Sequence, residues 1–153
     1  MKKSTVQEKV SIFTRLKQTW YVPVIIVLLA SISWIISTTV FGNESLRLDE
    51  SQSIWQTSHS LEGTLKVVAQ DVHMPLYHVI LHYWIVMFGN DIELIRMLSF
   101  IFFLLCLPFI YLLARMATLS RKWSLFVVAL FTLSPFVNWY ANEARMYTLL
   151  AFM

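Results

Sequence analysis

The sequence predicts an all-α integral membrane protein. Three long stretches carry no charged residue, at positions 18–43, 97–114 and 123–142, and each suits a membrane helix. Hydrophobic residues make up 58% of the chain and charged residues only 14%, whereas about a quarter of the residues in a soluble domain are charged. These observations exclude an ordinary soluble domain and make the charged residues the markers of topology and chemistry.

The first membrane span is predicted at residues 21–41, after an N-terminal tail of residues 1–20. Its apolar run is longer than the h-region of a signal peptide, and no small-x-small cleavage site follows, so we expect a retained signal anchor. The tail is basic, which by the positive-inside rule places it in the cytoplasm. This orientation role explains the net charge of +3 better than nucleic-acid binding does. The charged residues of the tail are Lys2, Lys3, Lys9, Arg15 and Lys17 against Glu8.

A short apolar segment, residues 75–88, decides the rest of the topology. As a helix it would be roughly 21 Å long at 1.5 Å per residue, which is short of the ~30 Å hydrocarbon core. If it crossed the membrane, Arg115, Arg121 and Lys122 would lie outside, against the positive-inside rule. We therefore predict an interfacial helix that does not span. Aromatic residues suited to that depth are Tyr77, Tyr83 and Trp84, and the polar face would be formed by His78 and His82.

With that helix outside the membrane core, the remaining segments alternate across the membrane. Residues 42–91 form an outer loop, in which two short surface helices are expected between Asp49 and Asp71. Pro135 predicts a kink in the third span. Because a membrane helix cannot end in lipid with its backbone unpaired, we expect the chain to be the N-terminal part of a longer protein. The other predicted segments are span 2 at 92–114, a cytoplasmic turn at 115–122, span 3 at 123–140, an outer loop at 141–147 and the start of span 4 at 148–153.

Two neighbouring acids, Asp49 and Glu50, lie where the chain leaves the first span on the outer face. A carboxylate at a membrane surface can take a proton from an acceptor hydroxyl, so Asp49 is a candidate general base. Glu50 is the second catalytic candidate, placed to position either the acceptor or Asp49. The alternative for both residues is an exposed acid in the first turn of a helix, which the helix dipole favours.

A second polar cluster, Glu143 with Arg145 and Tyr147, lies at the outer end of the third span. The planar guanidinium of Arg145 is well shaped to bind a phosphate, and Glu143 would orient it or pair with it. Tyr147 either lines the same site or belongs to the aromatic belt of the membrane interface. An arginine at this depth can also extend to the lipid headgroups without any catalytic role.

The histidines allow fewer conclusions. His73 precedes a helix start marked by Pro75, and on its own it indicates an exposed turn. His78 and His82 have the i, i+4 spacing of a metal pair, but the sequence supplies no third ligand. The polar face of an interfacial helix is the better interpretation. The one cysteine, Cys106, lies inside the second span and cannot form an internal disulfide.

Three short motifs, in order, resemble those of the GT-C membrane glycosyltransferases, in the branch of the protein O-mannosyltransferases and the lipid A aminoarabinose transferases. Leu-Asp-Glu at residues 48–50 is similar to the acidic pair of that family's first outer loop. His-Met-Pro-Leu-Tyr at 73–77 is similar to its His-Pro-Pro-Leu-Tyr element, and Asn-Glu-Ala-Arg-Met-Tyr at 142–147 to its Gln-Glu-Ala-Arg-Met-Tyr element. The departures, which bear on substrate detail more than on reaction class, are Met74, His78 and Asn142.

The resemblance implies a GT-C-type multi-span helical bundle with juxtamembrane helices in the first outer loop. It also implies inverting transfer of a sugar from a polyprenyl-phosphate donor to a hydroxyl of a lipid, glycan or protein acceptor. No cofactor is expected, and a divalent metal is not favoured because the additional acidic motifs of the metal-dependent oligosaccharyltransferase relatives are missing. Later spans help to bind the donor in that family, so this stretch alone is expected to be inactive. The implied site residues are Asp49 and Glu50 for catalysis and His73, Tyr77, Glu143, Arg145 and Tyr147 for substrate binding.

The rival interpretation is a non-catalytic multi-span membrane protein, such as a transporter fragment, an assembly subunit or a degenerate member of that family. Transporters place ionisable residues inside their spans, whereas the spans here are nearly free of them. The polar residues collect instead at one surface. The sequence therefore favours an interfacial enzyme of the cell membrane, multi-pass, with a cytoplasmic N-terminus and its site on the outer face.

Overall fold

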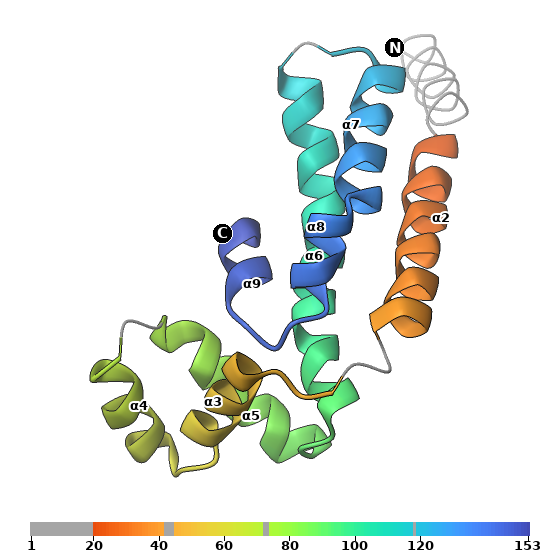
Figure 1. Cartoon of the computed structure of the whole chain (residues 1–153). Coiled ribbons are helices and arrows are strands. Elements are labelled where there is room, and N and C mark those ends of the chain that lie inside the picture. The colour runs from red at the N-terminus through yellow and green to blue at the C-terminus, as the bar shows by residue number, and fades with distance from the viewer. Residues whose placement is uncertain (1–19, 42–44, 72–73, 118) are drawn as a thin grey trace, which may run out of the picture.

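The computed structural model describes residues 20–41, 45–71, 74–117 and 119–153. All secondary structure in these ranges is helical, which confirms the predicted all-α class. Helices α2, α6 and α7 lie side by side, and α3, α4 and α5 gather at one end of them (Figure 1). The elements are α2 (Tyr21–Ile36), the π-helical turn η1 (Ser37–Phe41), α3 (Leu48–Thr57), α4 (Leu61–Ala69), α5 (Pro75–Phe88), α6 (Ile92–Met116), α7 (Arg121–Leu133), α8 (Pro135–Ala141) and α9 (Tyr147–Phe152).

Two helices in the described part of the chain are long and apolar enough to cross a membrane. The first, Tyr21–Val40, combines α2 with most of η1 and has 20 residues, and the second, α6, has 25. Helices α7 and α8 make a third candidate if they are one broken span, since the chain bends by 61° between them. Helix α5 has only 14 residues and falls among the shorter apolar helices. A membrane association is therefore plausible from length and composition, and the orientation stays a prediction from charge.

The long helices pack around one apolar core. Phe100 and Phe103 of α6 fill its centre, between Leu29 of α2 and Val128 of α7. The opposite face of α2 stays apolar although it is exposed, with Val27 62% accessible. Such a face costs free energy in water and none in lipid, which is consistent with a membrane span. The buried members of the core are Leu29, Phe100, Phe103, Leu107, Val128 and Ala141.

The bend between α7 and α8 is stabilised by one buried amide. Pro135 has no backbone N–H and cannot continue the hydrogen-bond ladder of α7. The side-chain Nδ2 of Asn138 donates instead to the carbonyls of Thr132 at 2.6 Å and Ser134 at 3.0 Å. Its Oδ1 accepts from Ser33 Oγ of α2 at 2.6 Å. Because unpaired backbone is costly in lipid, these bonds fix the direction in which α8 leaves the break.

We call α3, α4 and α5 the loop helices. Their limits follow from local chemistry: Ser60 Oγ caps α4 by accepting from Gly63 N at 3.3 Å, and Pro75 begins α5. Helix α5 ends at Gly89, whose φ of 98° is in the left-handed region that favours glycine. In Figure 1 the loop helices lie at the end of the bundle opposite the α6–α7 turn and the start of α2.

A second apolar core joins the loop helices to α6, and it corrects two expectations. Tyr77 is fully buried and His78 is 1% exposed, so Tyr77 does not reach the surface and His78 does not form an exposed polar face, whereas the interfacial depth of α5 stays a prediction. The reason is that α5 packs against α3, α4 and α6, which cover the face on which both residues lie. His78 Nδ1 lies 3.0 Å from the carbonyl oxygen of Met74, and His82 Nδ1 lies 3.1 Å from that of Thr57.

Candidate functional site

Two segments that are far apart in the sequence meet beside the loop helices. Residues 45–50 comprise the approach to α3 and its first turn, and residues 142–146 connect α8 to α9. Asn142 ties the second segment to the end of the first long helix, because its Nδ2 donates to Ser37 Oγ at 2.9 Å. The backbone N–H of Ala144 donates to Glu50 Oε1 at 3.0 Å. The acidic pair and the second polar motif of the sequence therefore belong to one cluster.

Glu50 is the centre of this cluster. Its Oε1 accepts from the Nε of Arg96 at 2.9 Å and from the N–H of Ala144, and its Oε2 accepts from Nη2 of Arg96 at 2.7 Å and from the N–H of Arg47 at 3.1 Å. A carboxylate has about four lone-pair sites, and these four bonds fill them. Burial raises the pKa of Glu50, but the bonds from Arg96, Ala144 and Arg47 outweigh it, so the pKa lies below its usual value.

Arg96 is a member of the charged cluster that the sequence analysis did not single out. It lies one turn into α6, is 7% exposed, and holds the Glu50 carboxylate with both arms of its guanidinium fork. A third contact runs from Nη2 to the carbonyl of Ser45 at 3.3 Å. The available signal was its position inside the predicted second span, because an arginine in such a place requires a partner. The sequence did not indicate which acid that partner would be.

Asp49 and Arg145 are brought together as a looser ion pair. Arg145 Nη2 lies 3.6 Å from Asp49 Oδ2, which is longer than a direct charge-assisted hydrogen bond of about 2.7–2.9 Å. The side chain of Asp49 is 54% exposed and that of Arg145 only 11%. Asp49 is in the first turn of α3, one residue before Glu50. Adjacent residues of a helix point about 100° apart, so one acid faces inward and the other faces out.

A third ion pair joins the same two segments with the charges reversed. Arg47 Nη1 lies 3.8 Å from Glu143 Oε2, and the Arg47 guanidinium stacks 3.8 Å from the ring centroid of Trp139. Burial raises the pKa of Glu143, and the nearby Arg47 and Arg145 oppose that shift. Arg47 was also not singled out from the sequence.

Two other residues predicted to bind substrate, Tyr77 and His73, are not part of the charged cluster that the structure describes. Tyr77 does not reach the surface: its hydroxyl lies 3.1 Å from Ser99 Oγ, which in turn donates to the carbonyl of Arg145 at 3.2 Å. Burial raises the pKa of Tyr77 strongly. Through Ser99 this tyrosine supports the turn that carries Arg145. His73 lies outside the residues that the structure describes.

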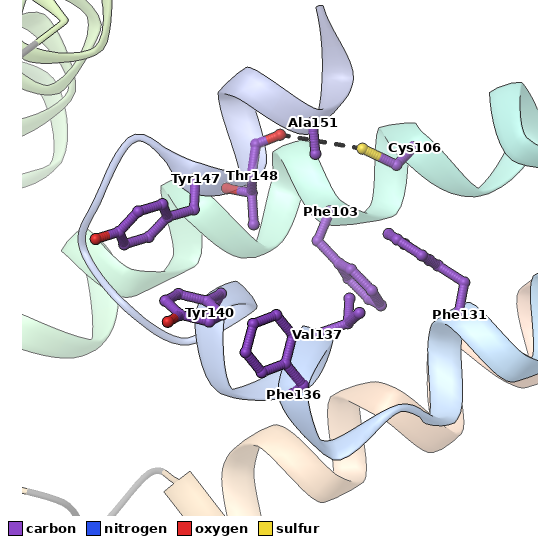
Figure 2. Close-up of a pocket in the computed structure, with 9 residues that line it drawn as sticks. All are labelled: Phe103, Cys106, Phe131, Phe136, Val137, Tyr140, Tyr147, Thr148 and Ala151. Carbon is purple, nitrogen blue, oxygen red and sulfur yellow. Dashed lines mark hydrogen bonds between the residues drawn. The ribbon is translucent and has the colours of Figure 1, made fainter.

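An apolar pocket of about 380 Å³ is lined by residues of α6, α7, α8 and α9 (Figure 2). Tyr147 links the pocket to the charged cluster, because it lines the pocket and its ring centroid lies 5.9 Å from the Arg145 guanidinium carbon. Its ring also packs edge-on against Tyr140, with centroids 4.6 Å apart. An arginine therefore lies beside the wall of a hydrocarbon-lined space. The lining residues are Phe103, Cys106, Phe131, Phe136, Val137, Tyr140, Tyr147, Thr148 and Ala151.

The described ranges contain no group of three or more His, Cys, Asp and Glu side chains arranged to hold a metal ion. The charged side chains of the cluster are those of three arginines and three acids. One acid, Glu50, is enclosed by donors, one, Glu143, is largely buried, and one, Asp49, is open to solvent. Such a cluster can bind an anion at an arginine and accept a proton at the open carboxylate.

Comparison with known proteins adds no relative, since no protein-family model, curated protein or solved structure matches this chain.

Proposed function

We propose that this chain is part of a membrane glycosyltransferase of the GT-C type, which transfers a sugar from a polyprenyl phosphate to an acceptor hydroxyl with inversion. One observation carries the proposal: a half-exposed carboxylate, Asp49, lies beside an arginine, Arg145, which is itself next to Tyr147 in the wall of an apolar pocket. An acceptor hydroxyl, a phosphate and a hydrocarbon chain require these three features. The three ordered motifs at residues 48–50, 73–77 and 142–147 support the same assignment.

In the proposed reaction Asp49 accepts the proton of the acceptor hydroxyl as its oxygen forms a bond to the anomeric carbon of the sugar. The bond from that carbon to the phosphate oxygen breaks, and the phosphate leaves with the electron pair. Attack from the side opposite the phosphate inverts the anomeric configuration. General-base assistance of this kind contributes about 10²–10⁴-fold, and Arg145 would stabilise the charge on the departing phosphate.

The apolar pocket would receive the first part of the polyprenyl chain. A phosphate held at Arg145 is close to Tyr147, so hydrocarbon attached to it can enter the space that this residue lines. Burial of apolar surface would then supply binding free energy, roughly 25 cal/mol per Å². The reacting end of the donor would stay at the charged cluster.

We propose a positioning role for Glu50, without direct contact to the acceptor. Its oxygens are occupied by Arg96, Ala144 and Arg47, so it acts as a positioning residue that holds the start of α3 against the 142–146 turn. Tyr77 supports the same turn through Ser99. Glu143 and Tyr147 border the donor region, and His73 stays a proposed substrate contact on resemblance alone.

The proposed setting is the cell membrane, with the N-terminus in the cytoplasm and the cluster on the outer face. The donor is a lipid-linked sugar, the acceptor a lipid, glycan or protein, and neither a cofactor nor a nucleic acid takes part. The basic tail supports this orientation. The α6–α7 turn supports it too: it lies at the end of the bundle opposite the loop helices (Figure 1), and Arg115 near the end of α6 and Arg121 and Lys122 at the start of α7 flank it.

A non-catalytic membrane protein is the second candidate, and one observation favours it. The three acids and three arginines of the cluster pair with one another, as they would in a purely structural contact between two segments. The distinguishing feature is Asp49: a structural pair gains little from a half-exposed acid at 3.6 Å, whereas a general base must reach its substrate.

The test uses the full-length protein in lipid nanodiscs with a panel of polyprenyl-phosphate sugars. We expect transfer from at least one donor, and we expect Asp49→Asn to reduce it at least 100-fold while the protein inserts and folds normally. The matched control is Glu62→Gln, which changes an exposed acid of α4 and should keep the wild-type rate. Transfer at the wild-type rate by the Asp49 variant would remove the general-base role, and no transfer from any donor would favour the non-catalytic candidate.

A further inference from the structure

The two ion pairs on either side of the Asp49–Glu50 peptide are built differently. Glu50 and Arg96 are bonded at 2.7 Å with side chains 0% and 8% exposed, whereas Asp49 and Arg145 are 3.6 Å apart and Asp49 is half exposed. The first pair is a fixed part of the fold. The second has a weak Coulomb attraction because water surrounds one partner, so a competing anion can replace it.

Arg145 would keep its place if Asp49 left. Its carbonyl accepts a hydrogen bond from Ser99 Oγ, its N–H donates to the carbonyl of Glu143 at 2.7 Å, and the N–H of the preceding Ala144 is held by Glu50. The guanidinium is 11% exposed beside the pocket wall at Tyr147. The backbone of Arg145 is therefore anchored, and its ion pair with Asp49 is exchangeable.

We infer that the Asp49–Arg145 pair is a latch that the phosphate of the lipid donor opens. This inference rests on the proposed function and adds the order of binding to it. A phosphate monoester or diester offers oxygens that match the guanidinium fork, and its hydrocarbon chain brings it to Arg145 from the pocket. Phosphate binding takes the arginine from Asp49 and frees the carboxylate to accept the acceptor's proton. The donor therefore binds first, and the base is available to an acceptor only when a donor is present.

The latch makes a prediction that the general-base role alone does not make. If Asp49 competes with phosphate for Arg145, Asp49→Asn should bind a lipid phosphate more tightly than the wild type. An exposed ion pair is worth about 0.2–1 kcal/mol, which corresponds to a gain of about 1.5- to 5-fold in affinity. Simple repulsion between Asp49 and the phosphate would also give a gain, so Arg145 must be varied in the same experiment.

The experiment measures binding of farnesyl phosphate to the full-length protein in nanodiscs, for the wild type, Asp49→Asn, Arg145→Gln and the double variant. We expect Asp49→Asn to bind about 1.5- to 5-fold more tightly, Arg145→Gln to bind at least tenfold more weakly, and the double variant to match Arg145→Gln. Arg145→Lys serves as a second variant if the glutamine protein does not fold, and it should keep part of the affinity because it retains the charge without the fork.

Three outcomes overturn the latch: no gain in Asp49→Asn, the same gain in the Arg145→Gln background, or no binding of farnesyl phosphate to the wild type. The result is separable from the proposed reaction. Tighter binding by Asp49→Asn without sugar transfer from any donor would leave the latch standing and overturn the transferase. Transfer by the wild type together with unchanged affinity in Asp49→Asn would do the reverse.

Discussion

The Glu50–Arg96 contact and the Asp49–Arg145 contact lie one residue apart at the start of α3, and their surroundings differ. Glu50 is enclosed, and its four acceptor positions are used by Arg96 and two backbone N–H groups. Asp49 is 54% exposed and meets Arg145 at 3.6 Å. The difference follows from helix geometry, since neighbouring residues point about 100° apart. An acidic pair in the first turn of a helix can thus supply one anchor and one available carboxylate.

The largest effect on stability is expected when one partner of the buried Glu50–Arg96 pair is removed. We expect Glu50→Gln and Arg96→Met each to lower the free energy of unfolding by about 3–5 kcal/mol, because each leaves an uncompensated buried group. The double variant should lose less than the sum of the two, since both charges are then gone. Unfolding of the detergent-solubilised protein by a denaturant series measures this. Additive losses would show that the two residues do not act as a pair.

The next largest effect is expected at Asn138, which fixes the direction of α8 toward the 142–146 turn. Asn138→Leu keeps a similar volume but leaves the carbonyls of Thr132 and Ser134 and the hydroxyl of Ser33 without this partner. The expected loss is about 1–3 kcal/mol, measured in the same unfolding series. Asn90→Ala, at an exposed position between α5 and α6, is the control. A loss in the control as large as in Asn138→Leu would contradict the account.

Lowering the pH should affect the stability contributions of Glu143 and Glu50 differently, because their pKa values are shifted in opposite directions. The pKa of Glu143 is raised above its usual 4.5 by burial, so folding is favoured by its protonation and this contribution is lost as pH rises through the folded pKa. The pKa of Glu50 is lowered, so its contribution is complete above 4.5 and is lost only as pH falls through the folded pKa.

The corresponding measurement is the unfolding midpoint between pH 7 and pH 3.5 for the wild type, Glu143→Gln and Glu50→Gln. As the pH falls from 7 to 4.5, the wild type should gain stability relative to Glu143→Gln. Below pH 4.5 the advantage of the wild type over Glu50→Gln should shrink. A pH profile of Glu143→Gln that parallels the wild type down to pH 4.5 would show that Glu143 does not titrate in this window.

The smallest effect on stability is expected at the open pair. Asp49→Asn should change the free energy of unfolding by less than about 1 kcal/mol, because the acid is half exposed and solvent screens its attraction to Arg145. The exposed Lys66–Glu62 pair of α4, at 2.6 Å, offers a comparison, and Lys66→Ala should lie in the same small range. If Asp49→Asn lowered the free energy of unfolding as much as Glu50→Gln does, the two acids would not have the different roles described above.

The sequence predicted the helices better than the contacts between them. Helix α5 has the predicted bounds of residues 75–88 because Pro75 and Gly89 mark its ends locally. The burial of Tyr77 and His78 was not predicted, since it depends on α3, α4 and α6 packing over one face of α5. The π-helical turn η1 likewise has no local signal in its residues.

The same limit applies to the site. Asp49, Glu50, Glu143 and Arg145 were singled out from the sequence, and the structure places all four in one cluster. What could not be predicted was the partner of each charge, because Glu50 and Arg96 are 46 positions apart in the sequence and no periodic signal pairs them. Those partners determine that Glu50 is an enclosed anchor and Asp49 an exposed carboxylate.

The central claim is that Glu50 holds the site together and Asp49 reacts. The most direct test is the rate of sugar transfer per folded molecule, measured in parallel for full-length Asp49→Asn and Glu50→Gln with a donor that the wild type uses. The account predicts that Asp49→Asn is fully folded and at least 100-fold slower, and that Glu50→Gln is poorly folded. A well-folded Asp49→Asn protein that transfers sugar at the wild-type rate would contradict it.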